Sequence, residues 1–114
     1  MSENLVDGKC VACKADAPPV TEAEIEELSP QIPSWEIHKI DNIQRLRCSF
    51  AFGNYLDGLA FLEKVAKLAE EEDHHPELVL EWGKVTVSWW SHKIKGLHKN
   101  DFIAAAKTDL IFSE

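Results

Sequence analysis

Histidines and carboxylates are concentrated in one part of this sequence. Three of its five histidines, His74, His75 and His92, lie close to an acidic run at 70–73 and to Asp101. An unperturbed imidazole has a pKa of about 6.5, so grouped histidines can exchange protons near neutral pH, bind a metal ion or hydrogen-bond a polar ligand. We therefore predict a functional site here. The plainer alternative is that the histidines cap a helix and Asp101 favours the start of another.

Metal binding is the less favoured chemistry for these residues. The adjacent pair His74-His75 lacks the i, i+4 spacing with which a helix presents two zinc ligands. Cys10 and Cys13 have the spacing of half a zinc site or of a redox pair, but no second pair follows them. We predict no metal site, and we treat the cysteine pair as structural or incidental, with metal or redox chemistry as alternatives.

The overall composition limits the class of protein. A chain of 114 residues is long enough for one domain. Its net charge of -8, with 20 acidic and 12 basic residues, argues against a surface for nucleic acid or anionic membranes. No apolar run approaches the roughly 20 residues of a membrane span, no secretory signal is evident, and an odd number of cysteines does not suggest a disulfide framework. We expect a cytoplasmic protein.

The elements that would position the histidines follow from capping, turn and periodicity signals. We predict a flexible N-terminal arm over 1–18 and a single domain over 19–114. The predicted helices are 21–29, 54–72 and 100–112, and the predicted strands are 35–40, 43–52, 78–82 and 85–92. This order predicts an α+β fold of two layers, a four-stranded antiparallel sheet with three helices on one face. Its uncovered face and edge strands predict self-association.

Periodicity also predicts which side chains are buried. In the strand 85–92, alternate residues starting at Val85 should face the helices, and the opposite set should place Trp90 beside His92 as a pocket wall. The helix 54–72 should bury a stripe of six residues, namely Tyr55, Leu59, Leu62, Val65, Ala66 and Ala69. The last helix should bury Phe102, Ile103, Ala106 and Leu110.

The spacing of the site residues resembles the signature of a known family. Three residues separate Glu70 from His74-His75-Pro76, five separate Pro76 from Trp82, nine separate Trp82 from His92, and eight separate His92 from Asp101. This pattern is similar to that of the pterin-4a-carbinolamine dehydratases, and the order of elements over 21–112 agrees with their fold. The resemblance implies a lyase without a cofactor, which converts 4a-hydroxytetrahydropterin to quinonoid dihydropterin for aromatic amino acid hydroxylases.

The resemblance also implies roles for individual residues. His74 and His92 would transfer protons, His75 would orient the pterin, and Asp101 would orient or polarise a histidine, or hold Lys99. Backbone groups around Pro76 and Ser91 would pair with the ring edge, Trp90 would stack on it, and Glu70 would support the histidine loop. The implied catalytic residues are His74, His75, His92 and Asp101. The implied substrate-binding residues are His74, His75, Pro76, Trp90, Ser91, His92 and Lys99.

One departure from the family pattern concerns the segment before Asp101. Animal members often carry a basic pair there, whereas this chain has Asn100, and Lys99 can replace a guanidinium as a charge but not as a planar fork. The cysteine arm suggests a bacterial member. The resemblance implies a homodimer or homotetramer and a functional link to phenylalanine hydroxylase. The alternative is a non-catalytic pterin-binding or regulatory dimerisation module.

Overall fold

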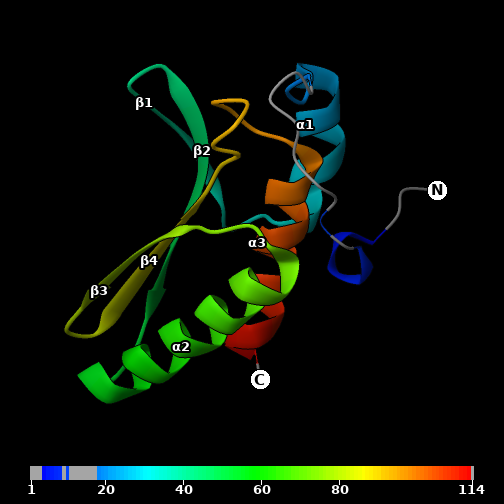
Figure 1. Ribbon diagram of the computed structural model, residues 1–114. Helices are drawn as coiled ribbons and strands as arrows, with labels where there is room; N and C mark the ends of the chain where they lie inside the picture. Colours follow the sequence, from blue (N-terminus) through cyan, green and yellow to red (C-terminus); the bar gives the residue numbers. More distant parts are fainter. Residues whose placement is uncertain (1–3, 9, 11–17, 114) are drawn as a thin grey trace.

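The computed structural model describes residues 4–8, 10 and 18–113, and it has the predicted α+β architecture (Figure 1). The sheet is antiparallel with the strand order β1-β2-β4-β3. Helices α2 and α3 cover one of its faces, and α1 lies on the same side. The elements in chain order are η1 (Leu5–Asp7), α1 (Glu22–Leu28), η2 (Ser29–Gln31), β1 (Glu36–Ile40), β2 (Ile43–Ala51), α2 (Tyr55–Glu72), β3 (Glu77–Glu81), β4 (Lys84–Trp89) and α3 (Lys99–Ser113).

Local capping and turn signals set the boundaries, as predicted. Thr21 and Glu24 form a reciprocal capping box at the start of α1. The turn between β1 and β2 places Asp41 and Asn42 at positive φ, which these two residue types tolerate better than most. Asn54 caps α2 by accepting a hydrogen bond from the Asp57 N–H.

The predicted buried stripe of α2 is partly wrong. Tyr55 is 45% exposed, and the face that meets the sheet instead includes Phe61 and Leu68 beside the correctly predicted Val65. The reason is the close approach of the helix to the sheet at Gly58, where an added Cβ would lie 3.3 Å from Leu80 Cδ1. Because glycine has no side chain, it is not one of the apolar residues whose spacing predicts the buried face of a helix. The sequence therefore did not show where this contact lies.

The other burial predictions have mixed outcomes. Val85, Val87 and Trp89 are fully buried under the helices, as predicted. Leu110 of α3 is 54% exposed, so its predicted burial is wrong. Leu5, within the predicted N-terminal arm, is 1% exposed and belongs to the hydrophobic core.

Among the described residues, no helix is both long and apolar enough to cross a membrane.

Asp109 on α3 gives a pH-dependent prediction. Burial raises the pKa of its carboxyl, although the Trp35 indole N–H, donated to Oδ1 at 2.9 Å, opposes this. A raised pKa means that the folded state binds the proton more tightly, so this stabilising contribution is present in acid and lost as pH rises through the folded-state pKa. We expect Asp109→Asn, which keeps the acceptor for Trp35, to stabilise the protein at neutral pH by less than about 1 kcal/mol, because the carboxyl is only half-buried.

Urea unfolding of the wild type and of Asp109→Asn would test this at pH about 7 and pH about 3. The advantage of the asparagine variant should vanish at the lower pH, where the aspartate is protonated in both states. An equal difference between the two proteins at both pH values would contradict the expectation.

Candidate active site

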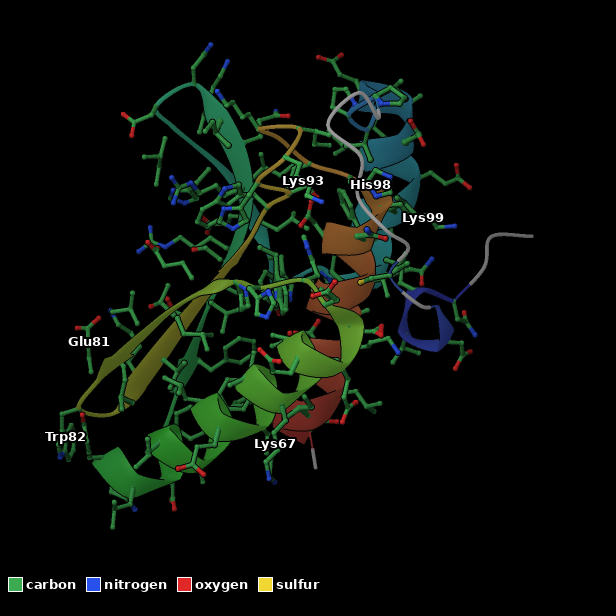
Figure 2. All side chains as sticks on the ribbon, in the orientation of Figure 1. Lys67, Glu81, Trp82, Lys93, His98 and Lys99 are labelled. Carbon is green, nitrogen blue, oxygen red and sulfur yellow. The ribbon has the colours of Figure 1, made fainter. Side chains whose placement is uncertain are left out.

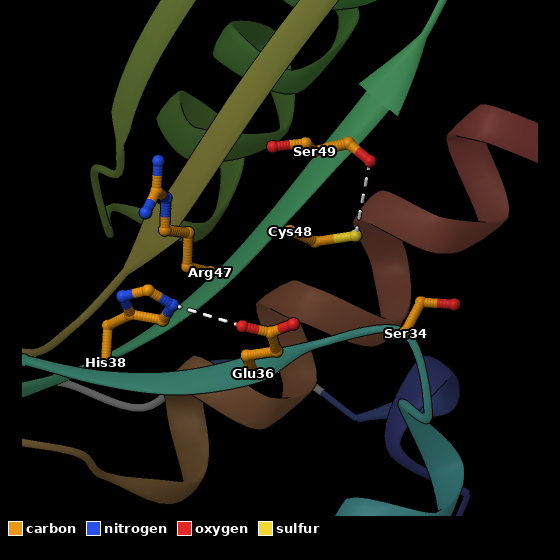
Figure 3. A pocket seen from close by; sticks show the side chains of 6 residues that line it. All are labelled: Ser34, Glu36, His38, Arg47, Cys48 and Ser49. Atoms are coloured by element: carbon orange, nitrogen blue, oxygen red, sulfur yellow. Dashed lines mark hydrogen bonds and ion pairs between the residues drawn. The ribbon is translucent and has the colours of Figure 1, made fainter.

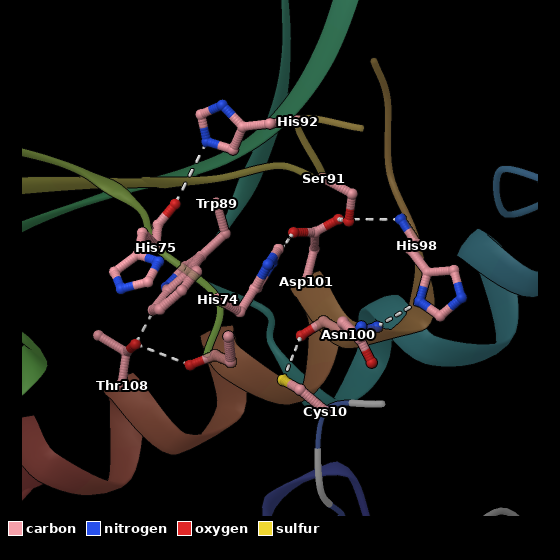
Figure 4. A network of polar contacts seen from close by, with 11 residues as sticks. Cys10, His74, His75, Trp89, Ser91, His92, His98, Asn100, Asp101 and Thr108 are labelled. Carbon is pink, nitrogen blue, oxygen red and sulfur yellow. Dashed lines mark hydrogen bonds and ion pairs between the residues drawn. The ribbon is translucent and has the colours of Figure 1, made fainter. Parts of the chain in front are cut away.

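A buried histidine–aspartate pair lies at the centre of the predicted site (Figure 4). His74 Nε2 is 2.6 Å from Asp101 Oδ1, and the two residues are 7% and 0% exposed. The other oxygen, Oδ2, accepts hydrogen bonds from Ser91 Oγ and from the His98 N–H, each at 2.9 Å. Because a carboxylate only accepts, it fixes the His74 hydrogen on Nε2 and the orientation of the ring.

The end of α2 decides which way each histidine points. Asp73 adopts the left-handed conformation, and the Asp73 and His74 N–H groups bond back to the Glu70 and Ala69 carbonyls. This is a Schellman ending, which turns the chain sharply. His74 then points inward and stacks on Trp89 at 5.4 Å, with 20° between the ring planes.

His75 points the opposite way, because successive side chains in an extended segment before a proline diverge. It is exposed, and its Nε2 lies 3.0 Å from Glu70 Oε1. His92 Nε2 donates to the His75 carbonyl oxygen at 3.3 Å, and the His92 ring lies 4.5 Å from that of Trp90. His75, Trp90 and His92 thus form an outer group, which is separate from the buried pair but joined to it through the chain.

The strand β4 ends at Trp89, earlier than the predicted boundary at His92. Ser91 continues the pairing as an isolated bridge to Gly96, in which the Ser91 N–H donates to the Gly96 carbonyl at 2.8 Å. The Ser91 N–H is therefore engaged within the protein, and its hydroxyl is bonded to Asp101. Both groups serve to build the site.

Lys99 and Trp82 are two further positions that the family pattern includes. Lys99 begins α3 and is labelled in Figure 2. Hydrogen bonds from Thr21, with a smaller effect of the charges of His98 and Lys99, lower the pKa of Glu24 on α1. Trp82, a member of the spacing signature, is 74% exposed in the turn at the far end of the β3–β4 hairpin.

Asn100 occupies a buried position, with 2% of its surface exposed. Its N–H donates to His98 Nδ1 at 3.1 Å, and its carbonyl oxygen accepts a weak bond from Cys10 Sγ at 3.6 Å. Burial raises the pKa of the Cys10 thiol to about 12.

Cys13 lies outside the described residues, so the cysteine pair remains a prediction. No group of three or more His, Cys, Asp or Glu residues suited to a metal ion occurs in the part of the chain that the structure describes.

Sequence reasoning missed three contacts of the site. It placed Trp89 inward but did not pair it with His74, nor with Thr108, whose hydroxyl accepts from the Trp89 indole N–H at 3.1 Å. It also missed Arg45, whose guanidinium carbon lies 3.9 Å from the centroid of the Trp90 ring. Residue alternation puts Arg45 on the open face of β2, but only the pairing of β2 with β4 brings it next to Trp90.

A hollow of about 420 Å³ lies elsewhere, beside β1 and β2 (Figure 3). None of its lining residues belongs to the predicted site, and within it His38 Nε2 lies 3.1 Å from Glu36 Oε2. Burial raises the pKa of the Cys48 thiol there to about 11. The lining residues are Ser34, Glu36, His38, Arg47, Cys48 and Ser49.

A sequence profile of one protein family, described as pterin 4 alpha carbinolamine dehydratase, matches residues 18–111. The match covers most of the chain and includes the buried pair and the outer group. The chain belongs to this family. The resemblance seen in the spacing of the histidines is thereby confirmed.

Close relatives of the chain are found among bacterial members of the pterin 4 alpha carbinolamine dehydratase family. A protein of Nitrosococcus oceani is 57% identical over 107 residues, which are 94% of this chain and 95% of the relative. A protein of Marinobacter nauticus is 53% identical over 109 residues, which are 96% and 98% of the two chains. Both are provisionally named pterin-4-alpha-carbinolamine dehydratase.

Solved structures agree with this assignment of the family fold. The crystal structure of a transcriptional coactivator/pterin dehydratase from Brucella melitensis has a TM-score of 0.73 and 29% identity, covering 82% of this chain and 98% of that one. A pterin dehydratase-like protein, identified as a RuBisCO assembly factor in the alpha-carboxysome, has a TM-score of 0.60 and 26% identity, covering 71% and 92%.

Proposed function

We propose that this chain is a 4a-hydroxytetrahydropterin dehydratase that works by histidine acid/base catalysis. The observation that carries the proposal is the buried hydrogen bond between His74 and Asp101, with His75 next in the chain and His92 bonded to the His75 carbonyl oxygen, in a chain that belongs to a dehydratase family. The elimination requires two proton transfers, and the site offers several imidazoles.

The chemistry of the elimination assigns the roles. The C4a–O bond breaks, a proton is delivered to the departing hydroxide to give water, the N5 proton is removed, and a C4a–N5 double bond forms. No electron is gained or lost. We assign His92 and His74 to these proton transfers without deciding between acid and base, and each transfer is typically worth about 10²- to 10⁴-fold in rate.

The remaining residues would bind or position. His75, exposed and joined to Glu70, would orient the pterin, with Pro76 and Trp90 beside it. Asp101 would act as a positioning residue, because it is fully buried and holds the His74 ring. Lys99 would supply a positive charge to the bound ligand, as the family resemblance implies, and its charge also acts on Glu24 of α1.

The proposed physiological role is to recycle the pterin cofactor of aromatic amino acid hydroxylases in the cytoplasm, with phenylalanine hydroxylase as the functional partner. We propose that the protein acts as a homodimer or homotetramer, since β1 and β3 are edge strands and one face of the sheet carries none of the described helices. A second candidate is a non-catalytic role, which is favoured by the assembly function stated for one structural relative.

The test is the rate of appearance of quinonoid dihydropterin from 4a-hydroxytetrahydropterin, followed by absorbance with and without protein. We expect an acceleration well above the spontaneous rate that is unchanged after treatment with a metal chelator. If the protein binds the pterin but leaves the rate at its spontaneous value, the non-catalytic role is the correct one. If chelation abolishes the acceleration, the proposed histidine mechanism without a metal is wrong.

A further inference from the structure

Arg45 is one of only two arginines in this acidic chain, the other being Arg47. It lies on β2 directly before Leu46, which is buried in the core and pairs with Trp89 on β4. Because side chains alternate along a strand, Arg45 is on the sheet face that the helices leave open. Across the other edge of β2 its register partner is His38 of β1.

The guanidinium of Arg45 lies over the Trp90 ring and is not neutralised by any of the described residues. Its central carbon is 3.9 Å from the Trp90 ring centroid, a distance typical of a cation–π contact. Its Nε is buried and is the one buried side-chain polar atom without a hydrogen-bond partner among the described residues. Within the same part of the chain, no carboxylate forms an ion pair with it. A buried donor without a partner is unfavourable, but a ligand cannot reach the buried Nε. The donors that a ligand could meet are the terminal Nη groups of this partly exposed side chain.

Trp90 connects Arg45 to the proposed site. The Trp90 ring contacts the His92 ring at 4.5 Å, and His92 Nε2 is bonded to the His75 carbonyl oxygen. A single indole therefore contacts both one of the imidazoles proposed for proton transfer and a guanidinium whose Nε has no partner among the described residues. A ligand that reaches His92 along this surface also comes within the neighbourhood of Arg45.

We propose that Arg45 is a substrate-binding residue, which donates hydrogen bonds to the carbonyl oxygen at C4 of the pterin ring. This inference rests on the proposed function. A guanidinium offers five donors and no acceptor, so it selects an acceptor edge of the ligand. In the pterin ring, the C4 carbonyl oxygen is the acceptor attached next to C4a, the carbon that loses its hydroxyl. Arg45 thus holds the pterin ring through its C4 carbonyl oxygen, which stays in the product when the 4a-hydroxyl is lost.

The chain supplies a matched control for the test. Arg47 is two residues along the same strand and on the same face, but it lines the hollow beside β1 and β2 rather than contacting Trp90. Steady-state kinetics would be measured for Arg45→Gln, Arg45→Lys and Arg47→Gln. The substrates are a 4a-hydroxytetrahydropterin with a methyl group at C6 and one with a hydroxylated side chain there.

We expect Arg45→Gln to raise KM by about 10- to 100-fold for both substrates and to change kcat by less than about threefold, because the lost bond is present before and during the reaction. Arg45→Lys should lie between it and the wild type, since it keeps the charge but not the fork. Arg47→Gln should leave KM within about twofold. Equal effects of the two glutamine variants, or an unchanged KM in Arg45→Gln, would overturn the proposal. So would a loss confined to the substrate with the longer side chain.

A binding measurement separates this inference from the proposed function. Calorimetry would use a 7,8-dihydropterin, which has the C4 carbonyl but no 4a-hydroxyl to lose. One outcome is that the wild type binds the 7,8-dihydropterin but does not dehydrate the 4a-hydroxytetrahydropterin, while Arg45→Gln binds the dihydropterin at least about tenfold more weakly. The inference then stands and the dehydratase proposal falls. If the wild type is catalytic and Arg45→Gln binds and reacts like it, only the inference falls. If the wild type neither binds nor reacts, both fall.

Discussion

Replacing His92 by alanine is expected to lower kcat for pterin dehydration by about 10²- to 10⁴-fold while leaving the fold intact. The expected loss is that of one proton-transferring group. The fold should survive because His92 is exposed, follows the end of β4, and its ring makes one hydrogen bond to the described residues, at 3.3 Å to the His75 carbonyl oxygen. Stopped-flow absorbance would give kcat, and thermal unfolding would give the midpoint temperature.

His38→Ala is the matched control for this experiment. His38 is also an accessible imidazole, but it lies on β1 beside Glu36 and outside the proposed site. We expect its kcat to equal that of the wild type. The assignment of His92 would be wrong if the two alanine variants lost activity to the same degree. It would also be wrong if His92→Ala kept the wild-type kcat at an unchanged midpoint temperature.

Asp101→Asn is expected to destabilise the protein by about 2–4 kcal/mol, although it changes only one side-chain atom. Asp101 is fully buried, and its two oxygens accept three hydrogen bonds, from His74, Ser91 and His98. An amide has one oxygen, so its NH₂ group must face at least one of these donors. Removing one partner of a buried pair leaves the other unsatisfied, which is why the effect is large.

Urea unfolding at neutral pH would measure this loss, and the midpoint temperature should fall by roughly 10–20 °C in a domain of this size. Asp109→Asn is the control, because the same change on the same helix α3 is expected to be neutral or slightly stabilising at this pH. An Asp101→Asn variant within about 0.5 kcal/mol of the wild type would show that the three hydrogen bonds do not contribute as their geometry indicates.

Much of the fold could be read from local signals. The capping box at Thr21, the Asn54 cap and the Asp41-Asn42 turn depend on a few neighbouring residues, so the sequence located the elements to within a few positions. The burial of α2 was harder, because it depends on which part of the helix approaches the sheet. That contact is set by Gly58, a residue without an apolar side chain.

The sequence by itself determined the family and the types of group at the site, because the spacing of His74, His75, His92 and Asp101 is a property of the chain alone. Only the tertiary structure decided where each group lies. Adjacent histidines became one buried partner of Asp101 and one exposed imidazole, because the left-handed Asp73 turns the chain between α2 and β3. Arg45 reached Trp90 because β2 pairs with β4 across 32 intervening positions in the sequence, counted from Ala51 to Lys84. Contacts between distant strands depend on how the sheet is ordered, and no local pattern encodes that order.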